Sequence, residues 1–212
     1  MQSSPAPRRS YGGKSAEQRR TERRETLVAA ALEMWQESGW AAVTMRGVCA
    51  RAGLTDRYFY ESFADRDALL ATLWDQMRDE TLMMLLAAIT PHANGDPIAQ
   101  LDAAVVAVVH HIGDEPRRAQ IIFGDHAGSA VLEQRRRDTI QMAVDLLIDL
   151  ARPYLREDVD EVAFRVSVLV GIGGFVETVL AWQSGLITAD ADTLARHLTG
   201  VGAGLAPQFL RP

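Results

Sequence analysis

The sequence predicts an all-α protein with a small N-terminal helical part and a larger C-terminal one. Apolar residues recur at three- and four-residue steps along nearly the whole chain, and the alternation that is typical of strands is almost absent. The 212 residues are 48% hydrophobic, which is enough to bury a sizeable core. We expect a flexible basic arm over 1–18, a small domain over 19–66 and a helical domain over 67–212.

The first helix is expected at about 19–38. Its apolar residues share one face: Leu27, Ala30, Ala31, Met34 and Trp35. Gly39 supplies a stop, because glycine readily ends a helix. Thr44 then caps a short second helix that ends at Gly53. The residues of this helix that face inward are Met45, Val48, Cys49 and Ala52.

Two further helix starts follow closely. Thr55 is expected to cap the third helix, and Asp56 lies in its first turn, where the helix dipole favours an acid. Phe59 and Phe63 are four residues apart and therefore share a face, which predicts that they belong to the core. Asp65 caps a longer fourth helix with Leu69, Leu70, Leu73, Trp74 and Met77 on its apolar side.

The C-terminal part is predicted to be helical after a loop over 91–97. Caps and breakers place helices near 98–112, 115–127, 129–151, 158–184 and 190–204. Charge-free runs such as 81–95 contain proline and polar residues and are shorter than the roughly 20 apolar residues of a membrane span. We expect no transmembrane helix, no secretion signal in the arm, and a cytoplasmic protein.

Charge is unevenly distributed along the chain. The net charge is -6, but residues 1–66 hold 11 basic and 8 acidic groups, and residues 67–212 hold 11 basic and 20 acidic groups. The first segment is therefore +3 and the second -9. Because binding to phosphates requires Lys and Arg, only the N-terminal third has the charge for DNA. The single cysteine, Cys49, excludes an internal disulfide or a cysteine-based zinc cluster and is expected to be a buried small residue.

Two short helices joined by "AGLT" form the pattern of a helix-turn-helix, whose second helix enters the major groove. The surrounding sequence is "RRETLVAAALEMWQESGWAAVTMRGVCARAGLTDRYFYESFADRDALL", from Arg23 to Leu70. Its ordered features are the arginine-led first helix, the Ala-Gly-Leu turn, Tyr60 followed by Phe63, and Arg66 before two leucines. In this segment, about a quarter of the chain, the protein resembles the TetR (tetracycline-repressor-like) family of transcriptional regulators.

The resemblance implies roles for the residues of this segment. It implies that 19–66 is a DNA-binding domain and that 67–212 is an effector-binding and dimerisation domain. Thr44 and Arg46 are placed for phosphate contact, and Arg57 is placed to bind guanine O6 and N7 as a bidentate pair. The residues expected to contact DNA are Thr44, Arg46, Thr55, Asp56, Arg57, Tyr58, Tyr60 and Arg66. A bundle that merely packs is the alternative, with Tyr58 and Tyr60 as packing residues.

The sequence also departs from the family pattern. Gly47 stands where a better helix former is usual and is expected to cost the second helix about 1 kcal/mol relative to Ala. Glu61 and Ser62 follow Tyr60 where the family often has an aromatic residue or His, which predicts weaker phosphate contacts on that side.

Enzymatic and metal sites are not expected. His110 and His111 are adjacent on a helix and so lie about 100° apart around its axis, unlike the i, i+4 pairs of helical metal sites. Ser129 lacks the strand-turn-helix setting of a hydrolase nucleophile. We therefore predict no catalytic residues, no metal and no cofactor. The run at 133–137, "EQRRR", is more typical of a solvated face than of a second nucleic-acid site.

An effector pocket between helices of the C-terminal domain is implied by the resemblance. Methionine suits irregular apolar ligands, although each candidate is individually more typical of a core. The candidates are Met77, Met84, His110, Phe123, His126, Met142 and Phe175, with Met83 and Asp125 as further residues of interest. The apolar, glycine-containing stretch at 166–182 must be covered on both sides, either within the chain or by a second subunit.

We expect a homodimer formed by the helices near 158–184 and 190–204, with no membrane partner. The predicted function is a ligand-responsive repressor that binds a palindromic DNA operator and is released by a small-molecule effector. The alternative is a ligand- or protein-binding module of the same fold that does not bind operator DNA. Salt dependence of duplex binding distinguishes the two.

Overall fold

The computed structural model describes residues 15–93 and 95–211. Within these ranges the chain is helical, as predicted, with one isolated antiparallel bridge between Leu155 and Leu210. Residues 1–14, most of the predicted flexible arm, lie outside the described ranges. The described α-helices are α1 (Ala16–Ser38), α2 (Met45–Ala52), α3 (Asp56–Tyr60), α4 (Arg66–Ile89), α5 (Pro97–Asp114), α6 (Pro116–Phe123), α7 (Ala130–Ala151), α8 (Glu161–Gln183) and α9 (Ala191–Phe209).

The expected caps position the N-terminal helices. Thr44 Oγ1 accepts from the Gly47 N–H at 3.1 Å, and Asp65 Oδ1 accepts from the Ala68 N–H at 2.8 Å. Thr55 is at the N-cap of α3, as predicted, but its side chain makes no capping hydrogen bond. Helix α1 begins three residues earlier than predicted, because Ser15 and Gln18 form a capping box that the sequence analysis did not use.

The main hydrophobic core is formed by residues of α1 to α4 and includes residues of the C-terminal domain. Trp35 is 2% exposed, and Phe59, Leu69 and Trp74 are fully buried. Ile121 of α6 and Leu132 of α7 belong to the same cluster. The N-terminal bundle therefore packs directly against the larger domain.

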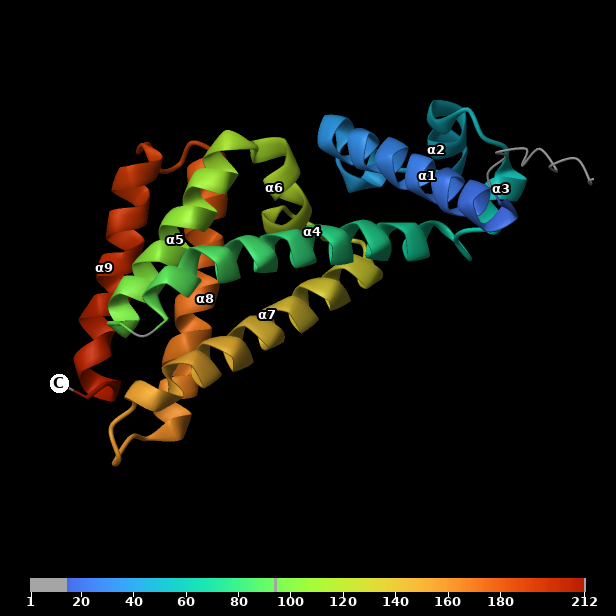
Figure 1. The fold of residues 1–212 in the computed structure, drawn as a ribbon. Helices are drawn as coiled ribbons and strands as arrows, with labels where there is room; N and C mark the ends of the chain where they lie inside the picture. The colour runs from blue at the N-terminus through green and yellow to red at the C-terminus, as the bar shows by residue number, and fades with distance from the viewer. Residues whose placement is uncertain (1–14, 94, 212) are drawn as a thin grey trace, which may run out of the picture.

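Helix α4 connects the two parts of the molecule. It runs from beneath the N-terminal bundle to the far end of the C-terminal domain, where α5, α8 and α9 gather (Figure 1). Helix α7 packs along α4, and the Trp74 Nε1–H donates to Thr139 Oγ1 at 3.1 Å between them.

Helix α8 presents much of its apolar surface to solvent. Val162, Val166, Leu169 and Val170 are between 50% and 73% exposed. Among the described helices, α8 is the one whose length and composition suit a membrane span, and it contains the apolar stretch at 166–182. Its Arg165 pairs with Asp145 of α7, which places this end of α8 against another helix of the domain.

The C-terminal helices follow the predictions except at α6 and α9. Helix α6 ends at Phe123 rather than near 127, because the backbone turns to an extended conformation at Gly124, where a Cβ would lie 2.3 Å from the Gln120 carbonyl oxygen and only glycine fits. His126 and Ser129 consequently lie in the connection between α6 and α7, and both are buried. Helix α9 continues to Phe209, past the predicted end at 204.

Candidate nucleic-acid interface and ligand cavity

The first turn of α3 projects from the N-terminal bundle. Thr55, Asp56 and Arg57 are exposed, and the Arg57 side chain is 84% exposed. Phe59 and Phe63 hold the opposite face, with exposed fractions of 0% and 4% and ring centroids 5.6 Å apart. The prediction that these two phenylalanines form part of the core is confirmed.

The two tyrosines of α3 occupy different environments. Tyr60 is 59% exposed and packs edge-to-face against Phe59, with ring centroids 5.7 Å apart. Tyr58 is half-buried, and the Arg23 guanidinium lies 4.4 Å above its ring, a cation–π arrangement. Tyr60 is therefore better exposed for an external partner than Tyr58.

The start of α2 lies close to α3, because the two helices pack together. Thr44 and Arg46 are both exposed. Within residues 15–93 and 95–211 the Arg46 side chain has no hydrogen bond or ion pair, so its charge is available to a partner outside the protein. Contact of these residues with DNA stays a prediction.

Arg66 is engaged inside the protein rather than projecting outward. Its Nε donates to the Val43 carbonyl, and its Nη2 donates to the Trp40 carbonyl at 2.8 Å. The guanidinium also lies 5.4 Å from the centre of the Trp40 ring. These contacts give it a role in the fold, since it joins the start of α4 to the turn before α2. The predicted contact of Arg66 with DNA stays a prediction.

Glu61 contacts three arginines at the end of α3, and the sequence analysis did not predict these contacts. Its Oε2 is 3.3 Å from Arg23 Nη2, its Oε1 is 3.1 Å from Arg57 Nε, and its carbonyl accepts from Arg20 at 2.8 Å. The pairing of Arg57 with Glu61 follows i, i+4 spacing, a signal that was present in the sequence. The pair uses only the Arg57 Nε, and the side chain is 84% exposed.

Comparison with known proteins identifies the N-terminal domain. Residues 27–73 match the model of the bacterial regulatory proteins of the TetR family. The chain carries a TetR-family helix-turn-helix domain. The matched residues include α2 and α3 and begin within α1, which confirms the resemblance inferred from the sequence. No match was found among the curated proteins.

Solved structures of regulators share the fold over most of the chain. A transcriptional regulator from Rhodococcus sp. Rha1 is 20% identical, with a TM-score of 0.71, over 89% of this chain and 99% of that one. NalD, the secondary repressor of the MexAB-OprM multidrug efflux pump in Pseudomonas aeruginosa, is 18% identical, with a TM-score of 0.66, over 90% and 98%. At these identities the likeness shows that the fold of TetR-family regulators extends to the C-terminal domain.

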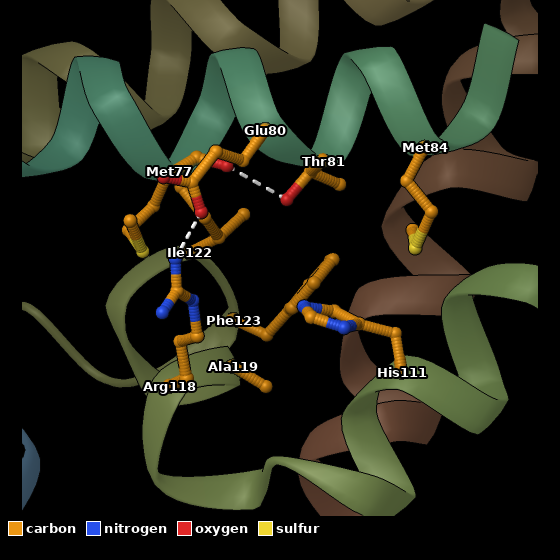
Figure 2. A pocket seen from close by; sticks show the side chains of 9 residues that line it. All are labelled: Met77, Glu80, Thr81, Met84, His111, Arg118, Ala119, Ile122 and Phe123. Carbon is orange, nitrogen blue, oxygen red and sulfur yellow. Dashed lines mark hydrogen bonds and ion pairs between the residues drawn. The ribbon is translucent and has the colours of Figure 1, made fainter. Parts of the chain in front are cut away.

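A cavity of about 180 Å³ lies between α4, α5 and α6 of this domain. Its walls are mainly apolar, and two oppositely charged side chains, Glu80 and Arg118, are paired at its edge (Figure 2). The His111 ring lies on the other side of the cavity in this view. The lining residues are Met77, Glu80, Thr81, Met84, His111, Arg118, Ala119, Ile122 and Phe123.

Three of the seven predicted pocket residues, Met77, Met84 and Phe123, line this cavity. The other four are not among its lining residues. His110 Nε2 is 2.8 Å from Asp192 Oδ1 of α9, and His126 is buried beside Trp35 and Trp74. Phe175 packs against Phe123 from outside the lining, and Met142 lies half-buried on α7.

Sequence reasoning missed the polar residues of the cavity. Glu80 and Arg118 are distant in the sequence, and each resembles an ordinary solvated charge on its own helix. Helical spacing did contain part of the signal, since Met77, Thr81 and Met84 are separated by four and three residues and share a face of α4. Within the part of the chain that the structure describes, no group of three or more His, Cys, Asp or Glu is arranged to hold a metal ion.

Proposed function

We propose that this protein is a DNA-binding transcriptional regulator that acts as a homodimer and responds to a small ligand. The exposed first turn of α3, anchored by Phe59 and Phe63, is the observation that carries the proposal. Arg46 and Arg57 supply exposed positive charge beside it. Such a helix fits the major groove, whose base edges an arginine reads by bidentate hydrogen bonds.

The proposed dimer uses α8 and α9. The exposed valines and leucine of α8 are accompanied by Val201 on α9, which is 65% exposed. A Cβ added at Gly171, Gly174 or Gly200 would meet no atom within 4 Å, so these helices leave space for another backbone to approach. Two copies joined through this surface would present their α3 helices to half-sites about 34–36 Å apart.

Ligand response requires that the effector prefer one of two dimer conformations. The cavity at α4, α5 and α6 is the proposed effector site, and α6 and α4 also contact α1 of the N-terminal helix-turn-helix domain. If the ligand binds more tightly to a dimer conformer whose α3 helices are wrongly spaced for the operator, the affinity for DNA falls. The fall can be no larger than the ratio of the ligand's affinities for the two conformers.

The decisive test is selection of bound duplexes from a random pool, followed by titration of the selected site at several salt concentrations. We expect a near-palindromic site and an affinity that falls steeply with salt. Arg57→Ala is expected to relax the preference at one base position, with a discrimination loss of about 1–3 kcal/mol. Arg137→Ala, an exposed arginine on α7, is the matched control. A flat salt response would exclude the DNA-binding function.

The dimer has its own test by light scattering. Val170→Glu places a charge in the exposed α8 surface and is expected to give monomers, whereas Met83→Glu, at a similarly exposed site on α4, is expected to leave the dimer intact. An unchanged mass for Val170→Glu would move the interface elsewhere.

A further inference from the structure

The cavity at α4, α5 and α6 is lined by one carboxylate, Glu80, and one guanidinium, Arg118, and a second carboxylate, Glu115, lies beside Arg118 outside the lining. Arg118 Nη2 contacts Glu80 Oε2, and Arg118 Nε lies 3.8 Å from Glu115 Oε2. One guanidinium therefore faces two carboxylates. The surrounding domain, residues 67–212, carries 11 basic and 20 acidic residues, so its overall field is negative.

This arrangement lets Arg118 exchange one carboxylate for the other. If Arg118 moves fully to Glu115, it keeps an ionic partner on its own helix, since the two are three residues apart. Among the described residues, Glu80 then keeps the Gln76 amide, which donates to Glu80 Oε1 at 3.0 Å, as its hydrogen-bonding partner. A positively charged ligand would restore an ionic partner to Glu80, and all the charges would be paired.

An anionic ligand would have the opposite effect. It would take Arg118 away from both carboxylates and leave Glu80 and Glu115 without a cation at the edge of a partly apolar site. Both carboxylates are about half exposed, so water screens them and the cost of losing their ionic partner is modest. Because Arg118 has a second carboxylate beside it, whereas Glu80 has no second cation among the described residues, the arrangement favours a cation over an anion.

The remaining walls restrict the size and the character of the ligand. Met77, Met84 and Ile122 are apolar, and Phe123 offers an aromatic ring that attracts cations. The Thr81 hydroxyl donates to the Met77 carbonyl at 2.8 Å, so its oxygen can still accept a hydrogen bond. The volume of about 180 Å³ slightly exceeds that of a cavity known to hold benzene, about 150 Å³.

We infer that the effector site takes a small organic monocation, an amine or ammonium compound with an apolar body of about one ring. This inference rests on the proposed ligand-responsive function, because it names the ligand class of that site. The cation pairs with Glu80, the Arg118 guanidinium turns to Glu115, and the apolar body lies against Met84 and Phe123.

Three probes of matched size test the charge preference directly. The DNA-free full-length protein is titrated by calorimetry at pH 8, where an ordinary imidazole is neutral, with 2-phenylethylammonium, 2-phenylethanol and phenylacetate. We expect the ammonium compound to bind about tenfold more tightly than the alcohol, and phenylacetate to bind most weakly. Equal affinities, tighter binding of phenylacetate, or no binding of the ammonium compound would overturn the inference.

Variants assign the preference to the proposed groups. Glu80→Gln keeps the shape of the side chain and is expected to bring the ammonium compound to within about twofold of the alcohol. Asp79→Asn removes the same charge from the neighbouring position of α4, outside the cavity lining, and is expected to preserve the tenfold difference. Arg118→Met removes the guanidinium that competes for Glu80 and is expected to tighten ammonium binding. A Glu80→Gln variant that keeps the full preference would refute the role of Glu80.

DNA binding is measured separately, so that the two proposals fail separately. If the ammonium compound binds in a Glu80-dependent manner but the protein ignores duplex DNA, the ligand class stands and the regulatory function falls. If the protein binds its selected DNA site but prefers phenylacetate, the regulatory function stands and the ligand class is wrong.

Discussion

Replacing Arg66 by alanine tests whether this residue serves the protein fold or a DNA phosphate. The side chain is part-buried and donates two hydrogen bonds to the carbonyls of Val43 and Trp40. Both carbonyls belong to the turn between α1 and α2, so the arginine fixes the geometry of the helix-turn-helix from the first residue of α4. Val43 is fully buried, and removing Arg66 leaves its carbonyl without this donor.

The expected loss of stability follows from these contacts. A hydrogen bond to a charged group contributes about 1.5–3 kcal/mol, and a cation–π contact about 0.5–1 kcal/mol when exposed. Because the guanidinium is only part-buried, water replaces some of this interaction in the variant. We therefore expect Arg66→Ala to lower the free energy of unfolding by about 2–4 kcal/mol. Arg66→Lys should restore only part of this lost stability, since an ammonium group lacks the planar fork of donors that bonds two carbonyls at once.

Urea unfolding followed by circular dichroism measures this loss, with all variants at one protein concentration. Arg46→Ala is the matched control, because Arg46 is exposed and has no partner in the described residues. The control is expected to unfold within about 0.5 kcal/mol of the parent while weakening DNA binding. Unchanged stability in Arg66→Ala, together with lost DNA affinity, would refute the structural role of Arg66.

Three further predictions concern the core and its stability. Burial lowers the pKa of His126 below its usual value, outweighing the Asp125 carboxylate, which acts in the opposite direction. The unfolded chain therefore takes up a proton first as the pH falls through about 6.5, and stability declines below that pH. His126→Phe should flatten this decline in urea unfolding between pH 8 and 5.5; identical pH profiles would contradict it. Phe59→Ala should cost about 3–5 kcal/mol by the same unfolding measurement, and a loss below 1 kcal/mol would show that α3 is not anchored there. Gly47→Ala should not give the roughly 1 kcal/mol gain expected from helix propensity, because the new Cβ would lie 2.7 Å from Met34 Cε and 2.9 Å from Thr44 Oγ1; a full gain in the unfolding free energy would show that Met34 moves freely.

Local chemistry made most of the fold predictable from the sequence. Thr44 and Asp65 cap their helices as expected, and Gly39 and Gly53 end theirs with φ angles of 79° and 65°, which glycine adopts without strain. These signals act within four residues, so they can be recognised without knowing the tertiary structure. Gly47 illustrates the limit, since the space for a Cβ at this position is taken by Met34, a residue of another helix.

The candidate sites were less predictable where they depend on distant contacts. Arg66 follows the family pattern, but only the folded chain brings the carbonyls of Val43 and Trp40 to its guanidinium. His126 was assigned to a helix and a pocket. It lies instead beyond the end of α6, and neither ring nitrogen has a hydrogen-bonding partner in good geometry within the described residues. The nearby carbonyls of Ile121 and Gln120 offset its burial only in part.

Helix α4 is uninterrupted from Arg66 to Ile89, so a small rotation at one end gives a large displacement at the other. A helix of 24 residues at about 1.5 Å per residue is about 36 Å long. A tilt of about five degrees at its C-terminal end swings its N-terminal end by about 3 Å, the full length of a hydrogen bond. Under the proposed function, a ligand beside Glu80 and Met84 would need only a slight angular displacement of α4 to separate the protein from DNA. A proline that kinks α4 between the N-terminal bundle and Met77 should then abolish the response.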